Sequence, residues 1–143
     1  MKAGRILLKQ IHDLADKHVD FGFETTLAGR TYVSLLKKLR DRGYSIHLFF
    51  LWIPNVKLSL ERIKERVSHG GHDVPARDVR RRFGRSLTNF ARFYMPLLNS
   101  WFLFDNSTTK PRLIAKGEQG RFTIEDSDLF SKITQSERFL LNP

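Results

Sequence analysis

The residues best suited to chemistry stand at the end of a predicted strand, where a carboxylate and two hydroxyls follow one another. Glu24, Thr25 and Thr26 close an alternating apolar segment at residues 19–25. A carboxylate there can hold a magnesium-bound water or accept the proton of a substrate hydroxyl. The hydroxyls can donate to a phosphate or a sugar, and Arg30 could contact phosphoryl oxygens through two parallel hydrogen bonds. The alternative is an ordinary strand end, at which a threonine caps the next helix and Arg30 is solvated.

A run of arginines forms the second group, in a segment with helical periodicity. Asp78 is the one acidic residue in this run. The arginines are Arg77, Arg80, Arg81, Arg82, Arg85 and Arg92. Neighbouring like charges on a helix repel one another by roughly a few tenths of a kcal/mol per pair. Bound anions or acidic neighbours would relieve that repulsion, whereas the alternative is a solvated basic face on a surface helix.

The whole composition is basic. The 143 residues contain 25 Lys and Arg against 15 Asp and Glu, which gives a net charge of +10. This balance favours anionic partners such as nucleotide phosphates, nucleic acid or an acidic protein. The absence of Cys excludes disulfides, thiol nucleophiles and Cys-based metal sites. We find neither a signal-peptide pattern nor an apolar run long enough to span a bilayer, so we expect a soluble, cytoplasmic protein with no membrane partner.

A turn with two histidines raises the question of a metal site. His69 and His72 are separated by two flexible glycines and followed by Asp73. Catalytic zinc takes three protein ligands as a rule, and no Cys assists here, so we expect no metal site. Gly70-Gly71 is better suited to a hinge that lets the basic helix close over an anion as a lid. The phosphate-cradling sequence GxxxxGK[ST] does not occur, because no Gly precedes a Lys.

Strand and helix patterns alternate along the chain. We expect strands at 19–25, at 45–53 as a buried central strand, and at 101–104, followed by a hairpin of residues 112–115 and 121–124. Helical periodicity predicts a first helix from Met1 and further helices over 31–42, 55–69, 75–98 and 126–135. We expect Gly43 to end the helix over 31–42 in a left-handed conformation and Asn55 to cap the helix that follows it. This order predicts one α/β domain over residues 1–143, with a parallel sheet flanked by helices. Ligands of such sheets bind beyond the carboxyl ends of the strands.

Three ordered blocks carry a resemblance to a known family. They are Phe21-Gly22-Phe23-Glu24-Thr25-Thr26-Leu27-Ala28-Gly29-Arg30, then Gly70-Gly71-His72-Asp73-Val74-Pro75 with Arg80-Arg81-Arg82-Phe83-Gly84-Arg85-Ser86-Leu87, and Phe104-Asp105-Asn106-Ser107. Together they resemble segments of the zeta-toxin-like P-loop kinases, most closely the branch of predicted ATPases. These bacterial ATP-dependent enzymes are typified by UDP-N-acetylglucosamine kinases of toxin–antitoxin systems. The similarity runs from about Ala3 to Phe130.

The resemblance implies roles for particular residues. Glu24 and Thr26 would contact the sugar-nucleotide substrate, with Arg30 beside them. Arg66 and either Arg81 or Arg82 resemble the lid arginines that stabilise charge on the transferring phosphate. The segment Asp105-Asn106-Ser107 resembles the loop near the adenine. The family uses ATP and Mg²⁺, and a toxin of this kind implies an acidic, antitoxin-like protein as a possible partner.

The chain also departs from the family pattern. The first strand, the Walker A loop with its helix, and the catalytic aspartate precede the equivalent of Ala3 in these kinases. The chain therefore resembles the C-terminal part of such a kinase, as a truncated reading frame or as a portion of a longer protein, and we expect it to be inactive alone. In P-loop kinases the first strand lies centrally. Without it, the strands at 19–25 and 45–53 must pair directly or leave apolar edges, so we expect marginal stability or self-association.

A non-enzymatic function remains as the alternative. The arginine-rich helix could make the chain a basic module that binds nucleic acid or an acidic protein. Nucleic-acid binding would weaken steeply with salt, whereas a sugar-nucleotide site would show competition by one specific ligand. The aromatic residues follow apolar stripes and are not interleaved with the arginines, which argues against nucleic acid.

Overall fold

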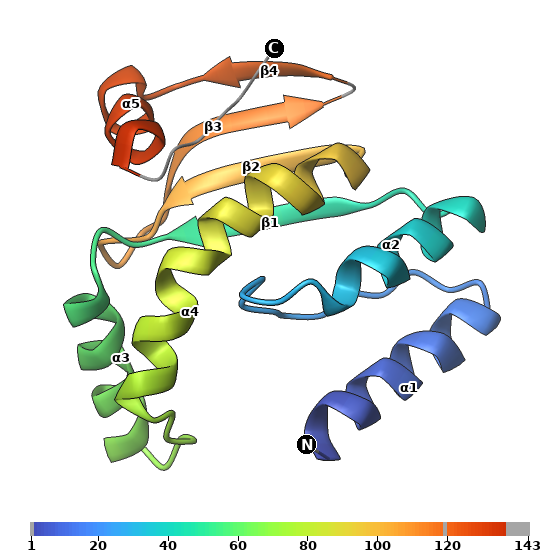
Figure 1. Cartoon of the computed structure of the whole chain (residues 1–143), viewed down its shortest axis with the longest axis horizontal. Helices are drawn as coiled ribbons and strands as arrows, with labels where there is room; N and C mark the ends of the chain where they lie inside the picture. Colours follow the sequence, from blue (N-terminus) through green and yellow to red (C-terminus); the bar gives the residue numbers. More distant parts are fainter. Residues whose placement is uncertain (1, 119, 137–143) are drawn as a thin grey trace.

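The computed structural model describes residues 2–118 and 120–136 (Figure 1). Two helices open the chain, and a strand and a helix pair precede a final group of three strands and one helix. In order, the elements are α1 (Lys2–Asp16), α2 (Thr31–Asp41), β1 (His47–Trp52), α3 (Val56–Ser68), α4 (Ala76–Asn89), a π-helical turn (Phe90–Tyr94), a 3₁₀ turn (Met95–Leu97), β2 (Ser100–Asp105), β3 (Arg112–Glu118), β4 (Arg121–Ile124) and α5 (Ser127–Ser136).

The strands form one sheet in the order β1-β2-β3-β4. β1 and β2 are parallel, which requires the crossover through α3 and α4, and the hairpin of β3 and β4 continues the sheet in antiparallel fashion. The predicted fold class is confirmed: an α/β chain with a partial P-loop-like parallel sheet, flanking helices and a C-terminal hairpin. None of the helices described is long and apolar enough to cross a membrane.

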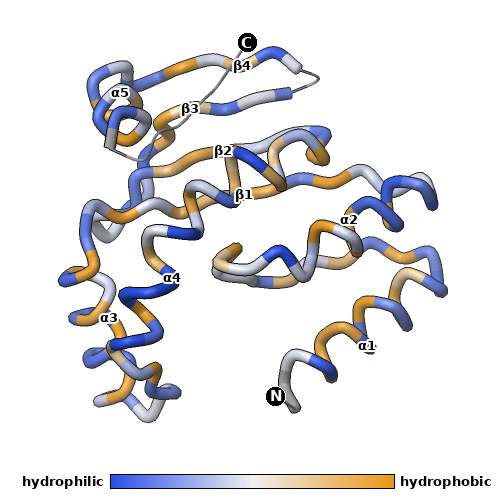
Figure 2. The backbone as a smooth tube through the Cα atoms, in the orientation of Figure 1, coloured by the Kyte–Doolittle hydropathy of each residue, from blue (hydrophilic) through white to orange (hydrophobic). Residues whose placement is uncertain are grey.

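One face of β1 and β2 is covered by the end of α4 and the π turn. Phe90 is fully buried there, with its ring centroid 5.0 Å from that of Phe50 and 5.8 Å from that of Trp101. Figure 2 shows why these segments meet, because β1 and β2 are largely hydrophobic while α4 alternates between the two colours. Leu87 near the end of α4 belongs to the same core cluster as the strand residues, while the arginines of α4 remain exposed.

The first two helices build the other part of the core. Ile11 and Ala15 of α1 and Leu35, Leu36 and Leu39 of α2 are buried in one cluster with the sheet residues. The helix α2 ends where the sequence predicts, because Gly43 has a φ of +88°. The predicted helix start at Met1 lies outside the described residues.

The strand predicted over residues 19–25 is wrong, since these residues form no helix or strand. Phe21 packs edge-to-face on Tyr44, and Phe23 contacts Tyr32, so these two side chains are partly buried against the core without a ladder, while Val19 is exposed. The central position predicted for the strand at 45–53 is wrong as well. β1 pairs with β2 alone and is an edge of the sheet within the described part of the chain.

The helices α3 and α4 begin close to where the sequence predicts. The Asn55 side chain accepts a hydrogen bond from the Leu58 amide at 2.9 Å and so caps α3, as predicted. The helix predicted over 75–98 is regular only to Asn89. It then widens into the π turn and tightens into the 3₁₀ turn, which contains Pro96, before the chain enters β2.

Candidate functional site

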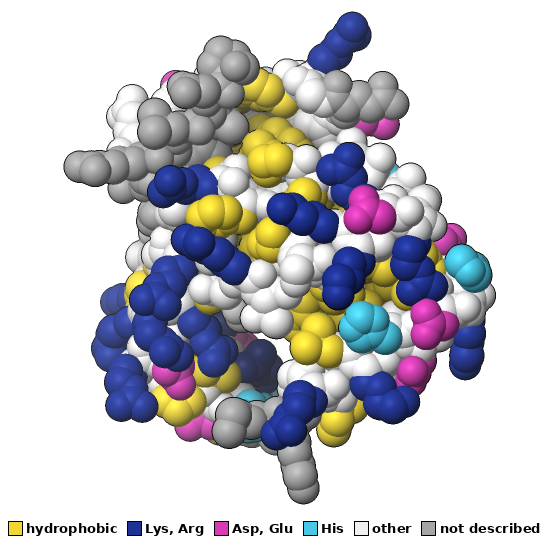
Figure 3. Space-filling model, turned by 45° about the vertical axis from the view of Figure 1, so that its right-hand side comes forward, with side chains coloured by type: hydrophobic (Ala, Val, Ile, Leu, Met, Phe, Trp, Pro, Cys, Tyr) yellow, Lys and Arg dark blue, Asp and Glu magenta, His cyan; other side chains and the backbone are white. Residues whose placement is uncertain are grey.

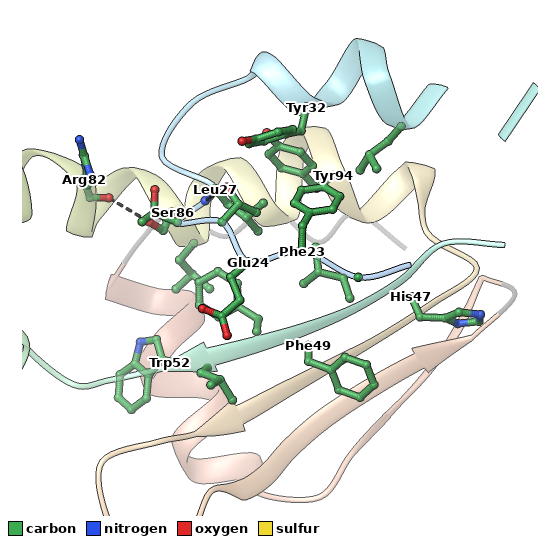
Figure 4. A pocket seen from close by; sticks show the side chains of 18 of the residues that line it. Phe23, Glu24, Leu27, Tyr32, His47, Phe49, Trp52, Arg82, Ser86 and Tyr94 are labelled. Carbon is green, nitrogen blue, oxygen red and sulfur yellow. Dashed lines mark hydrogen bonds between the residues drawn. The ribbon is translucent and has the colours of Figure 1, made fainter. Parts of the chain in front are cut away.

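A cavity of about 1020 Å³ lies between the segment 21–27 and β1. Figure 4 shows Phe23, Glu24 and Leu27 on one side of it and the strand β1 on the other, with Trp52 at the carboxyl end of the strand. Residues of α3 and α4 close the cavity at that end. The position agrees with the rule that ligands of α/β sheets bind beyond the carboxyl ends of strands.

The segment carrying Glu24 is held in place by local turns. The Thr25 hydroxyl accepts a hydrogen bond from the Leu27 amide at 3.2 Å. Leu27 is buried with a φ of +52°, a left-handed conformation that a side chain with a Cβ adopts at some cost. The surrounding structure must therefore impose this conformation on the segment.

Two side chains, one from the end of α4 and one from the π turn, hold the segment around Leu27 in this conformation. The buried Asn89 amide donates to the Leu27 carbonyl at 2.8 Å, and the Tyr94 hydroxyl donates to the Gly29 carbonyl at 2.6 Å. Residues five apart lie about 140° from each other around an α-helix. The π turn, in which the Met95 amide bonds the Phe90 carbonyl, brings Asn89 and Tyr94 toward the same side. Burial raises the pKa of the Tyr94 phenol, which therefore stays a neutral donor at pH 7.

Glu24 and Thr26, the residues predicted to contact substrate, both line the cavity. The Glu24 side chain is exposed, and Figure 4 shows its carboxylate directed toward β1. The Thr26 hydroxyl lies 3.5 Å from the Ala28 amide, a long hydrogen bond within the turn. The carboxylate is thus placed to accept hydrogen bonds from a molecule in the cavity.

The predicted arginines separate into two groups. Arg66 and Arg82 line the cavity, whereas Arg81 instead pairs with Asp78 at 2.9 Å. In Figure 4 the Arg82 side chain extends from α4 on the side away from Glu24. Arg30 lies outside the lining and stacks on the Phe93 ring, 3.8 Å from its centroid.

The arginine-rich surface belongs to one end of the molecule. Figure 3 shows a dense group of Lys and Arg side chains over the part built by α3 and α4, beside a hollow. Arg77, Arg80, Arg82 and Arg85 are all exposed on α4. The cavity therefore opens next to a strongly positive surface, which favours anionic ligands.

The loop predicted to lie near adenine is not part of this cavity. Asp105, Asn106 and Ser107 do not line it. The Asp105 carboxylate accepts a hydrogen bond from the Ser107 amide at 2.9 Å and lies 3.6 Å from the Arg112 guanidinium. These contacts stabilise the turn between β2 and β3, and a nucleotide-binding role for the loop stays a prediction.

The glycine pair after α3 ends that helix in a Schellman motif. The Gly71 amide bonds the Arg66 carbonyl and the Gly70 amide bonds the Val67 carbonyl, both at 2.9 Å, with φ of Gly70 at +84°. The Arg66 guanidinium also donates to the His72 carbonyl at 3.2 Å. The turn thereby fixes the end of α3 that carries Arg66, while its predicted use as a hinge is untested.

Replacing Gly71 by alanine is expected to destabilise the chain. A Cβ at this position would lie 2.8 Å from the Arg66 carbonyl oxygen, so the turn must shift. Gly84 within α4 is the matched control, because its Cβ would meet nothing within 4 Å. Gly84→Ala should stabilise by about 0.5–1 kcal/mol, as alanine does in helix interiors. Urea denaturation followed by circular dichroism measures both, and equal effects of the same sign would contradict the tight turn.

The cavity wall suits an anion better than a magnesium ion. Glu24 is the one carboxylate among the residues that line it, and it stands with Arg66 and Arg82. Within the described part of the chain, no group of three or more His, Asp or Glu side chains could hold a metal ion. The donors present therefore fit phosphate and sugar hydroxyls, and they do not fit Mg²⁺ by themselves.

Sequence patterns did not identify three residues of this site. Asn89 and Tyr94 act through the Leu27 and Gly29 carbonyls, and Trp52 lines the cavity at the end of β1. One feature of the sequence could have pointed to Asn89, because an Asn inside an otherwise apolar helix end needs a hydrogen-bond partner. Trp52 stands at the carboxyl end of a strand. An apolar residue at such a position is expected in the core, so no pattern in the sequence indicates that it lines the cavity.

Comparison with known proteins identifies the family to which the chain is similar. The model of the zeta toxin family matches residues 2–95. An uncharacterized protein of Haemophilus influenzae (strain ATCC 51907 / DSM 11121 / KW20 / Rd) is 33% identical over 81 residues, which are 57% of this chain. The matched part spans 58% of that relative's length. No solved structure matches the chain.

Proposed function

The chain belongs to the zeta toxin family, a family of P-loop NTPases, and on this premise we propose its function. It is the substrate-binding and lid portion of an ATP-dependent kinase that phosphorylates a sugar nucleotide similar to UDP-N-acetylglucosamine. The observation that carries the proposal is that Glu24, Thr26, Arg66 and Arg82 all line one cavity. These residues come from three separate segments, which only the fold brings together.

Each residue has a role in this proposal. Glu24 accepts hydrogen bonds from sugar hydroxyls, and Thr26 contacts the same substrate. Arg66 and Arg82 stabilise the negative charge of the phosphates, as arginine clamps do in phosphoryl transfer. Arg81 is the weaker choice for the lid arginine, because its guanidinium is paired with Asp78.

ATP supplies the phosphoryl group in such a kinase, and Mg²⁺ neutralises its charge. The sequence contains no GxxxxGK[ST] loop to cradle the β- and γ-phosphates. Removal of one electrostatic donor commonly costs ~10²–10³ in rate, and an entire cradle contributes more. The proposal therefore includes binding of the sugar nucleotide without phosphoryl transfer by this chain alone.

The experiment is titration calorimetry with UDP-N-acetylglucosamine. Glu24→Gln should weaken binding about tenfold or more, because a hydrogen bond to a charged group contributes about 1.5–3 kcal/mol. Glu65→Gln is the matched control, since Glu65 is an exposed glutamate of α3 outside the cavity lining. Equal affinities of the Glu24→Gln variant and the unchanged chain would overturn the assignment of the site.

A phosphorylation assay tests the second half of the proposal. With ATP, Mg²⁺ and UDP-N-acetylglucosamine, the chain alone should give no detectable product. Turnover that Glu24→Gln abolishes would show that the loop is dispensable, and it would leave the assignment of the cavity intact. Calorimetry thus tests the binding site, and the phosphorylation assay tests whether the chain alone catalyses the transfer.

A further inference from the structure

β4 is an open edge of the sheet. It pairs with β3 alone among the described strands, at the side of the sheet farthest from β1 (Figure 1). The Glu125 amide, directly after the strand, donates to the Ile114 carbonyl at 2.8 Å, so Glu125 directs its backbone groups to β3. Because backbone groups alternate along an antiparallel strand, those of Phe122 and Ile124 point to the outer side. In the described part of the chain these outer groups meet no backbone partner.

The side chains of Phe122 and Ile124 are also incompletely covered, although both are apolar. Phe122 is 46% exposed and Ile124 is 39% exposed. The Phe122 ring centroid lies 6.5 Å from that of Trp101 on β2 and 6.5 Å from that of Phe130 on α5. Both of these neighbours are buried, so Phe122 continues the core to the edge of the sheet. Apolar side chains beside an open backbone edge mark an interaction surface.

The other face of β4 carries opposite charges at symmetric positions. The sequence of residues 121–125 is Arg-Phe-Thr-Ile-Glu, with Thr123 at its centre. Arg121, Thr123 and Glu125 share one face, because side chains two residues apart along a strand point the same way. All three are exposed. Arg121 forms no ion pair with the described residues, and Glu125 forms a long one of 3.9 Å with Lys116.

We propose that β4 pairs with the β4 of a second copy of this chain, antiparallel and centred on Thr123. This register places Arg121 opposite Glu125 of the second copy, and the two-fold axis repeats the pair. It also sets Phe122 opposite Ile124, so that their outward backbone groups exchange hydrogen bonds. The two threonines meet at the centre, which is a favourable cross-strand pair. The sheets of the two copies become one continuous sheet.

The charges favour a second copy in this register. Charged residues at a sheet edge usually keep other strands away, and a net charge of +10 opposes self-association. The symmetric pairing nevertheless brings unlike charges together twice, at positions where the side chains of an antiparallel pair lie closest. A shift of the register by two residues would lose both ion pairs. β1 contains no acidic residue and no Lys or Arg, so the opposite edge of the sheet offers no such pairing.

The inference does not depend on the proposed function, because residues 121–125 take no part in the cavity. Sedimentation velocity of the full chain over a range of protein concentrations tests it. β4 has four residues, so the contact is small and the dimer should form reversibly as the concentration rises. Arg121→Glu and Glu125→Arg should each weaken the dimer about tenfold or more, because each places like charges opposite each other twice. Arg5→Glu is the matched control on the exposed side of α1 and should leave the dimer unchanged.

A mixture of the two variants tests the register itself. The Arg121→Glu chain is acidic at both positions and the Glu125→Arg chain is basic at both, so the mixture should form a heterodimer while each variant alone is monomeric. The double variant should also recover the dimer, and circular dichroism checks that each chain is folded. A chain that stays monomeric at every concentration overturns the proposal. A dimer that Arg5→Glu weakens as much as Arg121→Glu, or a mixture that stays monomeric, overturns it as well.

Discussion

Replacing Phe90 by alanine is expected to remove about 3–5 kcal/mol from the free energy of unfolding, the range seen for buried aromatic-to-alanine changes. Phe90 is fully buried and contacts Phe50 of β1 and Trp101 of β2, so it joins the helical layer to both parallel strands. Domains are stable by about 5–15 kcal/mol in total. The variant should therefore unfold at much lower urea concentration, as measured by circular dichroism.

Phe49→Ala is the control for this change. Phe49 also belongs to an aromatic pair, but it is 64% exposed, so its removal should cost under about 1 kcal/mol. The contrast separates burial from aromatic contact as the source of stability. Comparable losses for the two variants would contradict the assignment of the core to the face covered by the π turn.

Replacing Asn89 by alanine is expected to cost about 1–3 kcal/mol and to weaken sugar-nucleotide binding as well. The change leaves the Leu27 carbonyl without its buried donor, and an unsatisfied buried polar group costs about this much. Leu27 has a φ of +52°, which the remaining contacts must then maintain unaided. The segment that carries Glu24 would become less well defined. Denaturation and calorimetry with UDP-N-acetylglucosamine measure the two effects.

Asn55→Ala distinguishes positioning from general stability. Asn55 caps α3 through the Leu58 amide, so its loss should cost about 1 kcal/mol. Asn55 does not line the cavity, so sugar-nucleotide affinity should stay unchanged. If Asn89→Ala lowered stability and left affinity unaltered, Asn89 would be a core residue without influence on the site.

The sequence predicted those elements whose formation depends on local chemistry. The cap at Asn55, the left-handed Gly43 and the hairpin of β3 and β4 all follow from residue types and spacing. The strand at 19–25 failed because alternation indicates side-chain burial only. A strand also requires a neighbour for its backbone, and Phe21 and Phe23 are partly covered here by tyrosines instead.

The candidate site was predicted in part for a similar reason. The motif placed Glu24 and Arg82, which line the same cavity, but spacing could not choose between Arg81 and Arg82. Adjacent helical residues point about 100° apart, so the choice depends on how α4 lies against the sheet. Asn89 and Tyr94 act through the π turn, which no pattern in the sequence indicates.

That π turn also limits how relatives of this chain can vary. In a regular α-helix of the same length, the part of α4 before the turn would be rotated by about 100° relative to Tyr94. The arginine face and the donor to Leu27 would then leave their positions together. Homologues of the same length without the π turn must anchor the Glu24 segment by other side chains. Homologues one residue shorter between positions 89 and 94 would keep both donors, because residues four apart lie about 40° from each other around a regular helix.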